Sequence, residues 1–321
     1  MTVDINNLSP YLNKSSRDVF GKVLVDLAEA DERIIAITAE VSNSVRLDEF
    51  KNRWPHRFFD FGIAEQNMMA AAAGFARSGK IPYVSLYAIF ATLRAAEQVR
   101  TDIAYGNLPV KICPSHSGIS LGEGGPSHHT IEDISFYRSL PNMTVIIPAD
   151  GIETAMALRA TADLAGPVYI RLSRAPEPVV YTEKFNFTIG KARTVRNGND
   201  VTLIAYGASV GNALKAAETL MANSIDCRVI DMATIKPIDK QAILSAASET
   251  GAILSIEEHS IIGGLGSAVA EVLAEGGTNI KFTRLGIPDE FTLAGPYPEL
   301  QKYYHLDGAG IAKRVQSFLK E

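Results

Sequence analysis

Strand-like and helix-like sequence patterns alternate along almost the entire 321-residue chain. Short apolar runs such as Arg33–Thr38 and Val201–Tyr206 indicate buried strands, and the longer stretches between such runs have the period of helices. Neighbouring parallel strands need a crossover between them, usually a helix, and this alternation supplies it. The sequence therefore predicts the α/β class, with mainly parallel sheets flanked by helices.

The expected elements can be placed from hydrophobic period and from cap and breaker residues. Strands are expected at residues 33–38, 82–86, 110–113, 144–148, 167–173, 201–206, 227–231, 252–257 and 280–285. Helices are expected at residues 18–30, 68–75, 92–104, 151–164, 210–222, 239–248, 267–275 and 310–319. Ser15 or Ser16 is expected to cap the first helix.

The alternation is interrupted between residues 175 and 200, where Pro176, Pro178, Gly190 and Gly198 stand among mixed charges. Proline and glycine end regular elements, and segments of this composition commonly join domains. A chain of 321 residues is expected to form about two domains. We therefore expect one domain at residues 1–183 and a second at residues 184–321.

The bulk properties narrow the range of partners. A net charge of −5 and an isoelectric point near 5.8 argue against nucleic acid or an anionic membrane as the main partner. The first twenty residues lack the apolar core of a secretory signal, and no run approaches the roughly eighteen apolar residues of a membrane span. Cys113 and Cys227 lie far apart, without CxxC or Cys/His spacing. We expect reduced core thiols in a cytoplasmic protein.

Residues 58–75, FFDFGIAEQNMMAAAAGF, place a single carboxylate between an extended aromatic segment and an alanine-rich helix. Gly62 is expected to form the turn, so that Glu65 is buried near the start of the helix. Burying even a neutral polar group without a hydrogen bond costs roughly 2–7 kcal/mol, so this carboxylate needs a partner or a function. From the residues alone, a functional acid and a structural acid at the helix N-terminus stay equally open.

The run Ser115–His129, SHSGISLGEGGPSHH, combines four glycines, three histidines and a glutamate in a segment too irregular for a helix or a strand. Glycine lets the backbone approach a ligand closely, and histidine binds anions or transfers protons near neutral pH. The run therefore predicts a functional loop. Metal binding by His116, His128 and His129 is disfavoured, because neither an i,i+4 helical spacing nor a cysteine accompanies these histidines.

The GIAEQN segment resembles the glutamate motif of transketolases, 1-deoxyxylulose-5-phosphate synthases and the beta subunits of 2-oxoacid dehydrogenases, which are thiamine-diphosphate enzymes. The similarity covers essentially the whole chain and is strongest from about residue 33 to 175. It is greatest to the separate C-terminal subunit of a split transketolase. This resemblance implies a thiamine-diphosphate pyrimidine-binding domain followed by a transketolase C-terminal domain.

The resemblance assigns a cofactor role to several residues. It implies that Glu65 hydrogen-bonds N1′ of the aminopyrimidine and favours the imino tautomer, whose nitrogen removes the C2 proton of the cofactor. The segment Ser85–Tyr105 matches the next family element, which implies that Phe90 stacks on the aminopyrimidine and that Tyr87 flanks it. Without the Glu65 context, core packing is the favoured interpretation of both aromatics. Glu40 lies where transketolases carry an aspartate at the subunit junction.

The resemblance also assigns substrate contacts. His116 and Arg174 match residues that contact the sugar phosphate, and Ser44 matches a phosphate-contacting serine. His128 matches a residue that contacts substrate oxygens near the reacting carbon. Gly124 stands where transketolases usually carry an aspartate that contacts the hydroxyl next to the carbonyl carbon. Loss of that acceptor implies a changed or relaxed preference at this carbon, which His129 could offset by filling part of the gap.

Other conspicuous residues are expected to be structural. Arg171 precedes Arg174 by three residues and is expected to contact a structural partner. Gly263, Gly264 and Gly266 lie between a strand and a helix but lack the GxGxxG spacing, so they predict a close-packed turn. His259, just before these glycines, is expected to belong to the same packing.

The chain contains no GDG sequence followed by the downstream asparagine with which this family holds Mg²⁺ and the diphosphate. The resemblance therefore implies an N-terminal diphosphate-binding subunit as partner, in a heterotetramer of two such pairs with active sites between chains. The expected cofactors are thiamine diphosphate and Mg²⁺, and the partner is expected to supply most of the metal contacts. No metal ligand is assigned to this chain.

The expected activity is transfer of a two-carbon ketol unit from a ketose phosphate, or a similar anionic ketose, to an aldose phosphate. Two related enzymes stay open as alternatives: the beta subunit of a 2-oxoacid dehydrogenase, and a 1-deoxyxylulose-5-phosphate synthase. A scaffolding protein that kept the fold and lost the chemistry is disfavoured, because Glu65 and Phe90 are both present. The sequence leaves open which sugars are used, and whether the substrate anion is phosphate or sulfonate.

Overall fold

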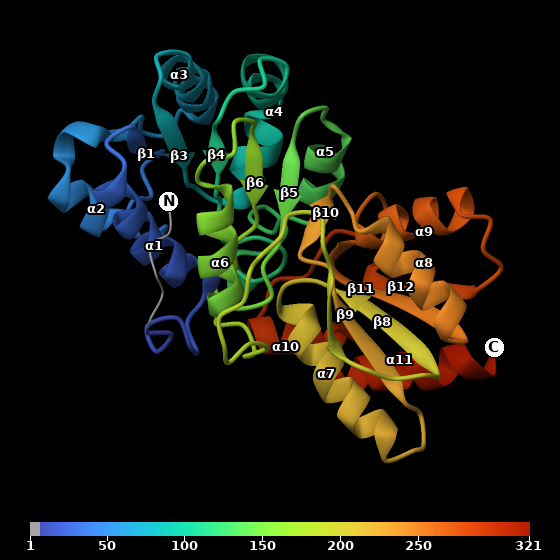
Figure 1. Ribbon diagram of the computed structural model, residues 1–321. Coiled ribbons are helices and arrows are strands. Elements are labelled where there is room, and N and C mark those ends of the chain that lie inside the picture. Colours follow the sequence, from blue (N-terminus) through green and yellow to red (C-terminus); the bar gives the residue numbers. More distant parts are fainter. Residues whose placement is uncertain (1–6) are drawn as a thin grey trace.

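The computed structural model describes residues 7–321 and places helices and strands in alternation (Figure 1). Residues 1–6, where the expected first domain and the segment compared with secretory signals begin, lie outside the described residues. The elements up to residue 170 are α1 (Ser16–Ala30), β1 (Ile34–Thr38), α2 (Asp48–Arg53), η1 (Pro55–Arg57), β2 (Phe58–Asp60), α3 (Glu65–Arg77), β3 (Ile81–Val84), η2 (Phe90–Arg94), α4 (Ala96–Gln98), η3 (Val99–Ala104), β4 (Lys111–Ile112), η4 (Gly122–Gly124), α5 (Asp133–Ser139), β5 (Thr144–Ile146), α6 (Gly151–Thr161) and β6 (Val168–Ile170). The later elements are β7 (Arg193–Arg196), β8 (Val201–Ala205), α7 (Ala208–Met221), β9 (Cys227–Asp231), β10 (Thr234–Lys236), α8 (Lys240–Glu249), β11 (Ala252–Ser260), α9 (Leu265–Glu275), β12 (Lys281–Ile287), α10 (Tyr297–Tyr303) and α11 (Gly308–Lys320).

The strands form two sheets. The first has seven strands in the order β10-β5-β6-β4-β3-β1-β2, and the second has five in the order β12-β11-β8-β9-β7. All pairs are parallel except β10 with β5 and β7 with β9. The predicted α/β class with mainly parallel sheets is therefore confirmed. Residues 171–192 form neither helix nor strand, and the expected domain border at residues 183 and 184 falls in this segment.

Helices cover both faces of each sheet, as Figure 1 shows. In β1, Ile34 and Ala36 pack into one hydrophobic cluster with α1 and α6, whereas Ile35 and Ile37 pack into another with α3 and α5. Successive side chains of a strand point to opposite faces, so a continuous apolar strand is buried on both sides. The second sheet repeats this arrangement, with α7 and α11 on one face and α8 and α9 on the other.

The structure differs from the expected elements mainly where segments are short. The helix expected at residues 92–104 is divided into two π-helical segments, η2 and η3, with the short α4 between them. The sequence-based assignment missed α2, α5, α10, β7 and β10, each of which is too short to show a clear period. The cap prediction is settled in favour of Ser15, whose side chain accepts the N–H of Asp18.

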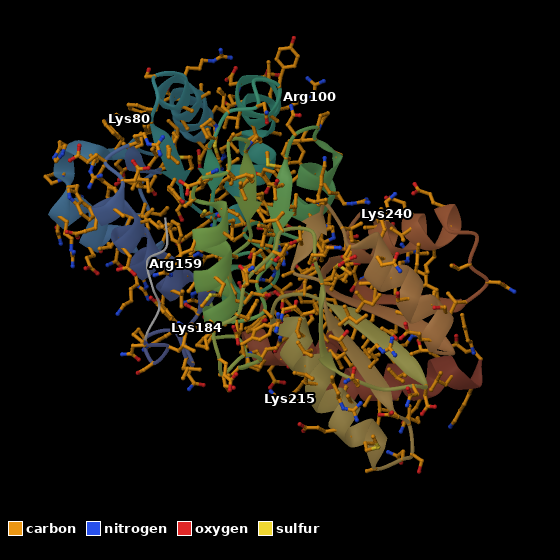
Figure 2. The ribbon with its side chains drawn as sticks, in the orientation of Figure 1. Lys80, Arg100, Arg159, Lys184, Lys215 and Lys240 are labelled. Atoms are coloured by element: carbon orange, nitrogen blue, oxygen red, sulfur yellow. The ribbon has the colours of Figure 1, made fainter. Side chains whose placement is uncertain are left out.

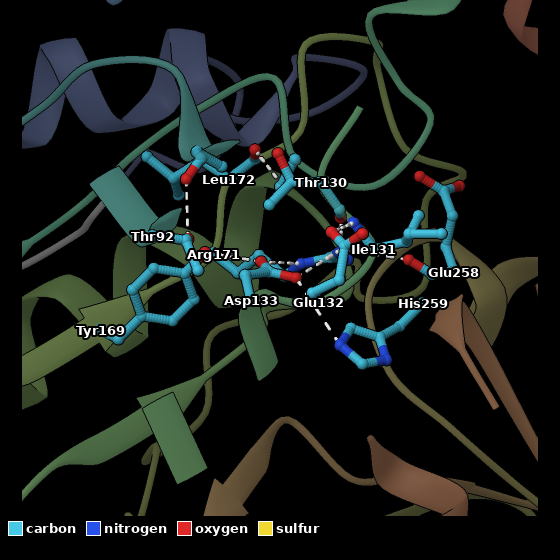
Figure 3. A network of polar contacts seen from close by, with 12 residues as sticks. Thr92, Thr130, Ile131, Glu132, Asp133, Tyr169, Arg171, Leu172, Glu258 and His259 are labelled. Atoms are coloured by element: carbon cyan, nitrogen blue, oxygen red, sulfur yellow. Dashed lines mark hydrogen bonds and ion pairs between the residues drawn. The ribbon is translucent and has the colours of Figure 1, made fainter. Parts of the chain in front are cut away.

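A network of polar contacts around a buried ion pair joins the two sheets (Figure 3). Arg171, at the end of β6, donates from Nε to Asp133 Oδ2 at 2.7 Å, and Tyr169 donates to the same oxygen at 2.6 Å. Arg171 Nη2 also donates to the carbonyl of Glu258 in β11, at 3.0 Å. Burial acts to lower the pKa of Arg171, but the Asp133 carboxylate raises it above its ordinary value. His259 is fully buried, and its Nε2 lies 4.0 Å from Asp133 Oδ1. The structural roles expected for Arg171 and His259 are therefore confirmed.

The C-terminal part of the chain also holds the histidine-containing loop in place. Glu258 accepts the N–H of Ile119 at 3.0 Å, within that loop. His129 Nε2 lies 2.9 Å from the Gly122 carbonyl and must donate to it, so its Nδ1 accepts from the Thr292 hydroxyl at 2.7 Å. Contacts from residues more than 130 positions away therefore fix a segment that has no regular structure of its own.

Charged side chains such as Lys80, Arg100, Lys215 and Lys240 lie around the periphery of the molecule (Figure 2). Within residues 7–321, none of the helices has the length and apolar character needed to cross a membrane. Across the same residues, no three or more histidine, cysteine, aspartate or glutamate side chains are grouped to hold a metal ion.

Candidate active site

The predicted site residues follow the carboxyl ends of parallel strands in the seven-stranded sheet. Those ends meet at one edge of a parallel sheet, where α/β proteins commonly bind ligands. In strand order from the sheet interior outward, the residues are Arg174 after β6, His116 after β4, Tyr87 and Phe90 after β3, Glu40 and Ser44 after β1, and Glu65 after β2. The parallel topology therefore gathers side chains that are up to 130 positions apart in the sequence, from Ser44 to Arg174.

Glu65 is the first residue of α3 and only 4% exposed. Gly62 makes the turn that leads to it, with a φ of 65° that side chains rarely allow. The Glu65 carboxylate accepts a hydrogen bond from Arg94 Nη1 at 2.7 Å. The same Arg94 guanidinium lies over the Phe90 ring, with Cζ 4.2 Å from the ring centroid. The buried acid thus has a partner, and that partner also covers the aromatic residue predicted to stack on a cofactor.

Aromatic and histidine rings continue the site from Phe90. The ring centroid of His128 lies 5.5 Å from that of Phe90 and 6.4 Å from that of Tyr87. Tyr87 in turn packs against His116, with 4.2 Å between ring centroids, and its hydroxyl lies 3.3 Å from Ser44 Oγ. The structure therefore brings together five residues that the sequence analysis assigned to cofactor or substrate.

Beyond Tyr87 lies a basic cluster made of His116, Arg17 and Arg174. Arg17 Nη1 lies 3.3 Å from His116 Nε2 and donates at 2.9 Å to the Ser44 carbonyl. Because arginine only donates, His116 Nε2 accepts, and its Nδ1 carries the hydrogen that bonds Ser115 Oγ at 2.8 Å. Burial lowers the pKa of His116 to about 3, and the positive charges of Arg17 and Arg174 act in the same direction. His116 is therefore neutral at physiological pH in this arrangement.

Arg17 belongs to this basic cluster, and the sequence analysis did not identify it. Burial lowers its pKa, as do the nearby Arg46 and Arg174 guanidinium groups. Its Nε is buried and has no hydrogen-bond partner among the described residues. A signal was available, because Arg17 lies in the first turn of α1, where the helix dipole disfavours a cation. A bound anion would offset this unfavourable placement of a positive charge.

Three other assignments have different outcomes. The Glu40 carboxylate is exposed and, within residues 7–321, forms no hydrogen bond or ion pair, so the structure does not bring it to the other site residues. At Gly124, an added Cβ would lie 2.6 Å from Leu121 Cδ2, so the Leu121 side chain occupies the space. His129 does not fill that gap, since both of its ring nitrogens are engaged by Gly122 and Thr292.

Comparison with known proteins decides the family. The transketolase pyrimidine-binding domain family matches residues 13–177, and the transketolase C-terminal domain family matches residues 190–311. The chain belongs to the transketolase family. A protein of Methanocaldococcus jannaschii named as a transketolase C-terminal section is 43% identical over 96% of this chain and 97% of its own length.

Two further relatives of this transketolase-family chain come from divided enzymes. An apulose-4-phosphate transketolase subunit of Phocaeicola vulgatus is 40% identical over 95% of this chain and 97% of its own length. A solved structure of a split gene transketolase, described as an inactive beta4 tetramer, is 42% identical and has a TM-score of 0.88, covering 95% of this chain and 98% of that one. The resemblance to the C-terminal subunit of a split transketolase is confirmed.

Glu177 couples two basic residues of this transketolase-family site. Its buried carboxylate accepts hydrogen bonds from Ser16 N–H at 3.0 Å and from Ser16 Oγ at 2.6 Å. Ser16 Oγ in turn accepts the Ser173 N–H at 2.7 Å. Arg17 and Arg174 are the next residues in each segment, so this carboxylate ties the start of α1 to the segment after β6. Burial raises the pKa of Glu177 to about 8, because the interior penalises the charged form.

Glu177→Gln is expected to make the thermal stability of the chain less dependent on pH. A carboxyl whose pKa is raised by folding contributes stability that is complete below its ordinary pKa of 4.5 and is lost as the pH rises through the folded value of about 8. Thermal unfolding followed by circular dichroism should therefore show the wild type losing Tm relative to the variant across this window. Glu218→Gln, at an exposed carboxylate, is the control. An identical pH dependence in wild type and Glu177→Gln would contradict the raised pKa.

Proposed function

We propose that this chain is the pyrimidine-binding subunit of a split transketolase. With a partner it transfers a two-carbon ketol unit from a ketose phosphate, or a similar anionic ketose, to an aldose phosphate. The observation that carries the proposal is a continuous row of contacts from a buried acid to a basic cluster. In order, the row runs through Glu65, Arg94, Phe90, His128, Tyr87, His116 and Arg17.

The acidic end of the row fits the aminopyrimidine part of thiamine diphosphate. Thiamine diphosphate supplies the nucleophilic carbon and the electron sink that ketol transfer requires. Glu65, buried and aimed at a planar cation, would hold a proton between its carboxylate and N1′ of the aminopyrimidine. Phe90 offers a ring face for stacking and Tyr87 a flanking one. Glu40, with its exposed carboxylate, would contact the cofactor at the subunit junction.

The basic end of the row fits the anionic tail of a sugar. The Arg17 and Arg174 guanidinium groups and His116 lie near one another, and within the described residues none of them forms an ion pair with a carboxylate. Guanidinium groups bind phosphate with paired donors, and a neutral His116 could donate from Nε2 in its other tautomer, with Nδ1 then accepting from the Ser115 hydroxyl. Ser44 is next to this cluster, because its Oγ lies 3.3 Å from the Tyr87 hydroxyl and its carbonyl accepts a hydrogen bond from Arg17. His128, between the two ends, would contact substrate oxygens near the reacting carbon.

The proposed partner is an N-terminal subunit that binds the diphosphate and supplies most of the Mg²⁺ contacts, in a cytoplasmic heterotetramer of two such pairs. We retain residues 183 and 184 as the border between the pyrimidine-binding and C-terminal domains. The relative described as an inactive beta4 tetramer supports the need for a second kind of subunit. The test is to mix the purified chain with its partner and measure thiamine-diphosphate-dependent ketol transfer. Activity is expected only in the mixture, and robust turnover by the pure chain alone would refute the proposal.

His116→Ala and Arg174→Ala are each expected to raise the KM for anionic substrates by about tenfold or more, since a hydrogen bond to a charged group contributes about 1.5–3 kcal/mol. The KM for an uncharged substrate such as glycolaldehyde should change little. Steady-state kinetics of the complex with its partner measure both. Arg46→Ala removes a neighbouring cation that has its own partner in Asp18 and is the matched control. Equal losses on charged and neutral substrates would show that His116 and Arg174 support the fold instead.

Gly124 is proposed to relax the preference for configuration at the carbon next to the carbonyl. A site that lacks the acceptor no longer penalises a sugar whose hydroxyl is absent, moved or replaced by a branch. The relative named for apulose-4-phosphate supports this proposal, because its name specifies a particular sugar for a protein of this type. The wild-type complex should accept aldehydes of both C2 configurations with similar kcat/KM.

Gly124→Asp combined with Leu121→Ala is expected to restore selectivity, because the second change removes the side chain that a Cβ at residue 124 would strike. Leu121→Ala alone is the control. The measurement is the ratio of kcat/KM for the two configurations. Strong wild-type selectivity for the usual configuration, unaltered in the double variant, would mean that Gly124 is only a loop glycine.

A further inference from the structure

Arg94 makes two contacts with a single planar group. Its Nη1 donates to Glu65 Oε1 at 2.7 Å, and its Cζ lies 4.2 Å from the centre of the Phe90 ring. The guanidinium thus presents an N–H edge to the buried acid and a flat face to the aromatic ring, which is how guanidinium groups stack on aromatic side chains.

These are the two contacts that the proposed function assigns to the aminopyrimidine ring. A ring hydrogen-bonded at its edge to Glu65 and stacked on Phe90 would need the space that the guanidinium occupies. The rings that contact Phe90, those of His128 and Tyr87, lie 5.5 and 6.2 Å away between centroids, farther from the ring centre than the Arg94 Cζ at 4.2 Å. The guanidinium and the aminopyrimidine cannot make these contacts at once.

We propose that Arg94 is a displaceable occupant of the pyrimidine site, which holds Glu65 and Phe90 in the unliganded chain and must leave when the cofactor enters. The inference rests on the proposed function of Glu65 and Phe90. It gives Arg94 a regulatory role, because every cofactor molecule that binds must first break its two contacts. Arg94 therefore weakens cofactor affinity and protects a buried carboxylate from standing unpaired.

The surroundings of Arg94 allow this movement. Its side chain is 45% exposed, whereas that of Arg171, which joins the two sheets, is 4% exposed. The Arg94 side of the ion pair faces solvent, so little free energy is lost when the guanidinium leaves, provided that the aminopyrimidine takes its place at the buried Glu65 carboxylate. Arg94 is also the last residue of η2, a π-helical segment, and such segments occur frequently at functional sites. Leaving Glu65 would place the guanidinium in solvent at a low cost.

The test is the affinity of the chain–partner complex for thiamine diphosphate in the presence of Mg²⁺, measured by isothermal titration calorimetry. Arg94→Ala is expected to bind about three- to thirtyfold more tightly than the wild type, because the competing contacts are gone. Arg94→Lys, which keeps the charge but loses the planar fork, should fall between them. Arg100→Ala removes an exposed arginine six residues away and should leave the affinity unchanged.

Equal or weaker binding by Arg94→Ala, with clear binding by the wild type, would overturn the role of Arg94 and leave the proposed function intact. Absence of binding by the wild type and by every variant would overturn the proposed function, and this inference with it. A crystal structure of the complex with thiamine diphosphate provides a second measurement. Arg94 is expected to be away from Glu65 in that structure, and an intact Arg94–Glu65 ion pair beside the bound cofactor would refute displacement.

Discussion

Glu65→Gln is expected to lower ketol-transfer turnover by at least about 10²-fold, the lower end of the range for a positioned acid–base group. Glutamine keeps the size of the side chain and can still accept a hydrogen bond from Arg94, but it cannot carry the charge that stabilises a proton on the cofactor. The measurement is kcat of the complex with its partner at saturating thiamine diphosphate. Folding and assembly, followed by circular dichroism and size-exclusion chromatography, should be unchanged.

Glu97→Gln is the control for this experiment. Glu97 is an exposed carboxylate in α4 that accepts a hydrogen bond from the adjacent Gln98. The control should keep full turnover. If Glu65→Gln also kept full turnover with the cofactor site saturated, Glu65 would have no part in the mechanism.

Asp133→Asn is expected to lower the free energy of unfolding by about 3–5 kcal/mol, the usual effect of removing one partner of a buried ion pair. The change removes the ion-paired carboxylate of the buried Arg171 guanidinium, since Asp133 is fully buried and bonds both Nε and Nη2. Urea denaturation followed by circular dichroism measures the effect. Part of the loss should return in the double variant Asp133→Asn/Arg171→Met, which removes the uncompensated charge.

The matched control is Glu271→Gln. Glu271 is a half-exposed partner of Arg138, in an ion pair that joins the two halves of the chain. Exposed pairs contribute at most about 1 kcal/mol, so this variant should unfold at nearly the wild-type urea concentration. Equal effects of the buried and the exposed change would show that the Asp133–Arg171 pair does not hold the sheets together.

Local sequence was enough to predict the region around Glu65. A glycine that permits a positive φ, followed by an acid and an alanine-rich run, predicts a turn into a helix and a buried carboxylate, and the structure has both. The irregular histidine loop was also predictable, because its glycines exclude a regular element. The residues alone left the role of Glu65 open, and only the family resemblance assigned it.

Residues that act through distant partners could not be predicted in this way. Arg17 meets His116 across 99 positions, and Ser16 meets Glu177 across 161. Glu177 looked like one more residue of a proline-rich connection, although it is buried and ties two segments of the site together. Arg94 falls within the helix expected at residues 92–104, and it contacts Glu65 from the end of a π-helical segment that the sequence did not reveal.

The sequence by itself determined the alternation of strands and helices, the turn into Glu65 and the position of the histidine loop, because these follow from the period and backbone preferences of neighbouring residues. Only the tertiary structure decided that β10, from the second half of the chain, completes the first sheet beside β5. It also decided which acid and which cations meet at the site. The reason is that the choice of partner depends on how sheets and helices pack, and a three-residue strand or a single arginine carries no local signal of where its partner lies.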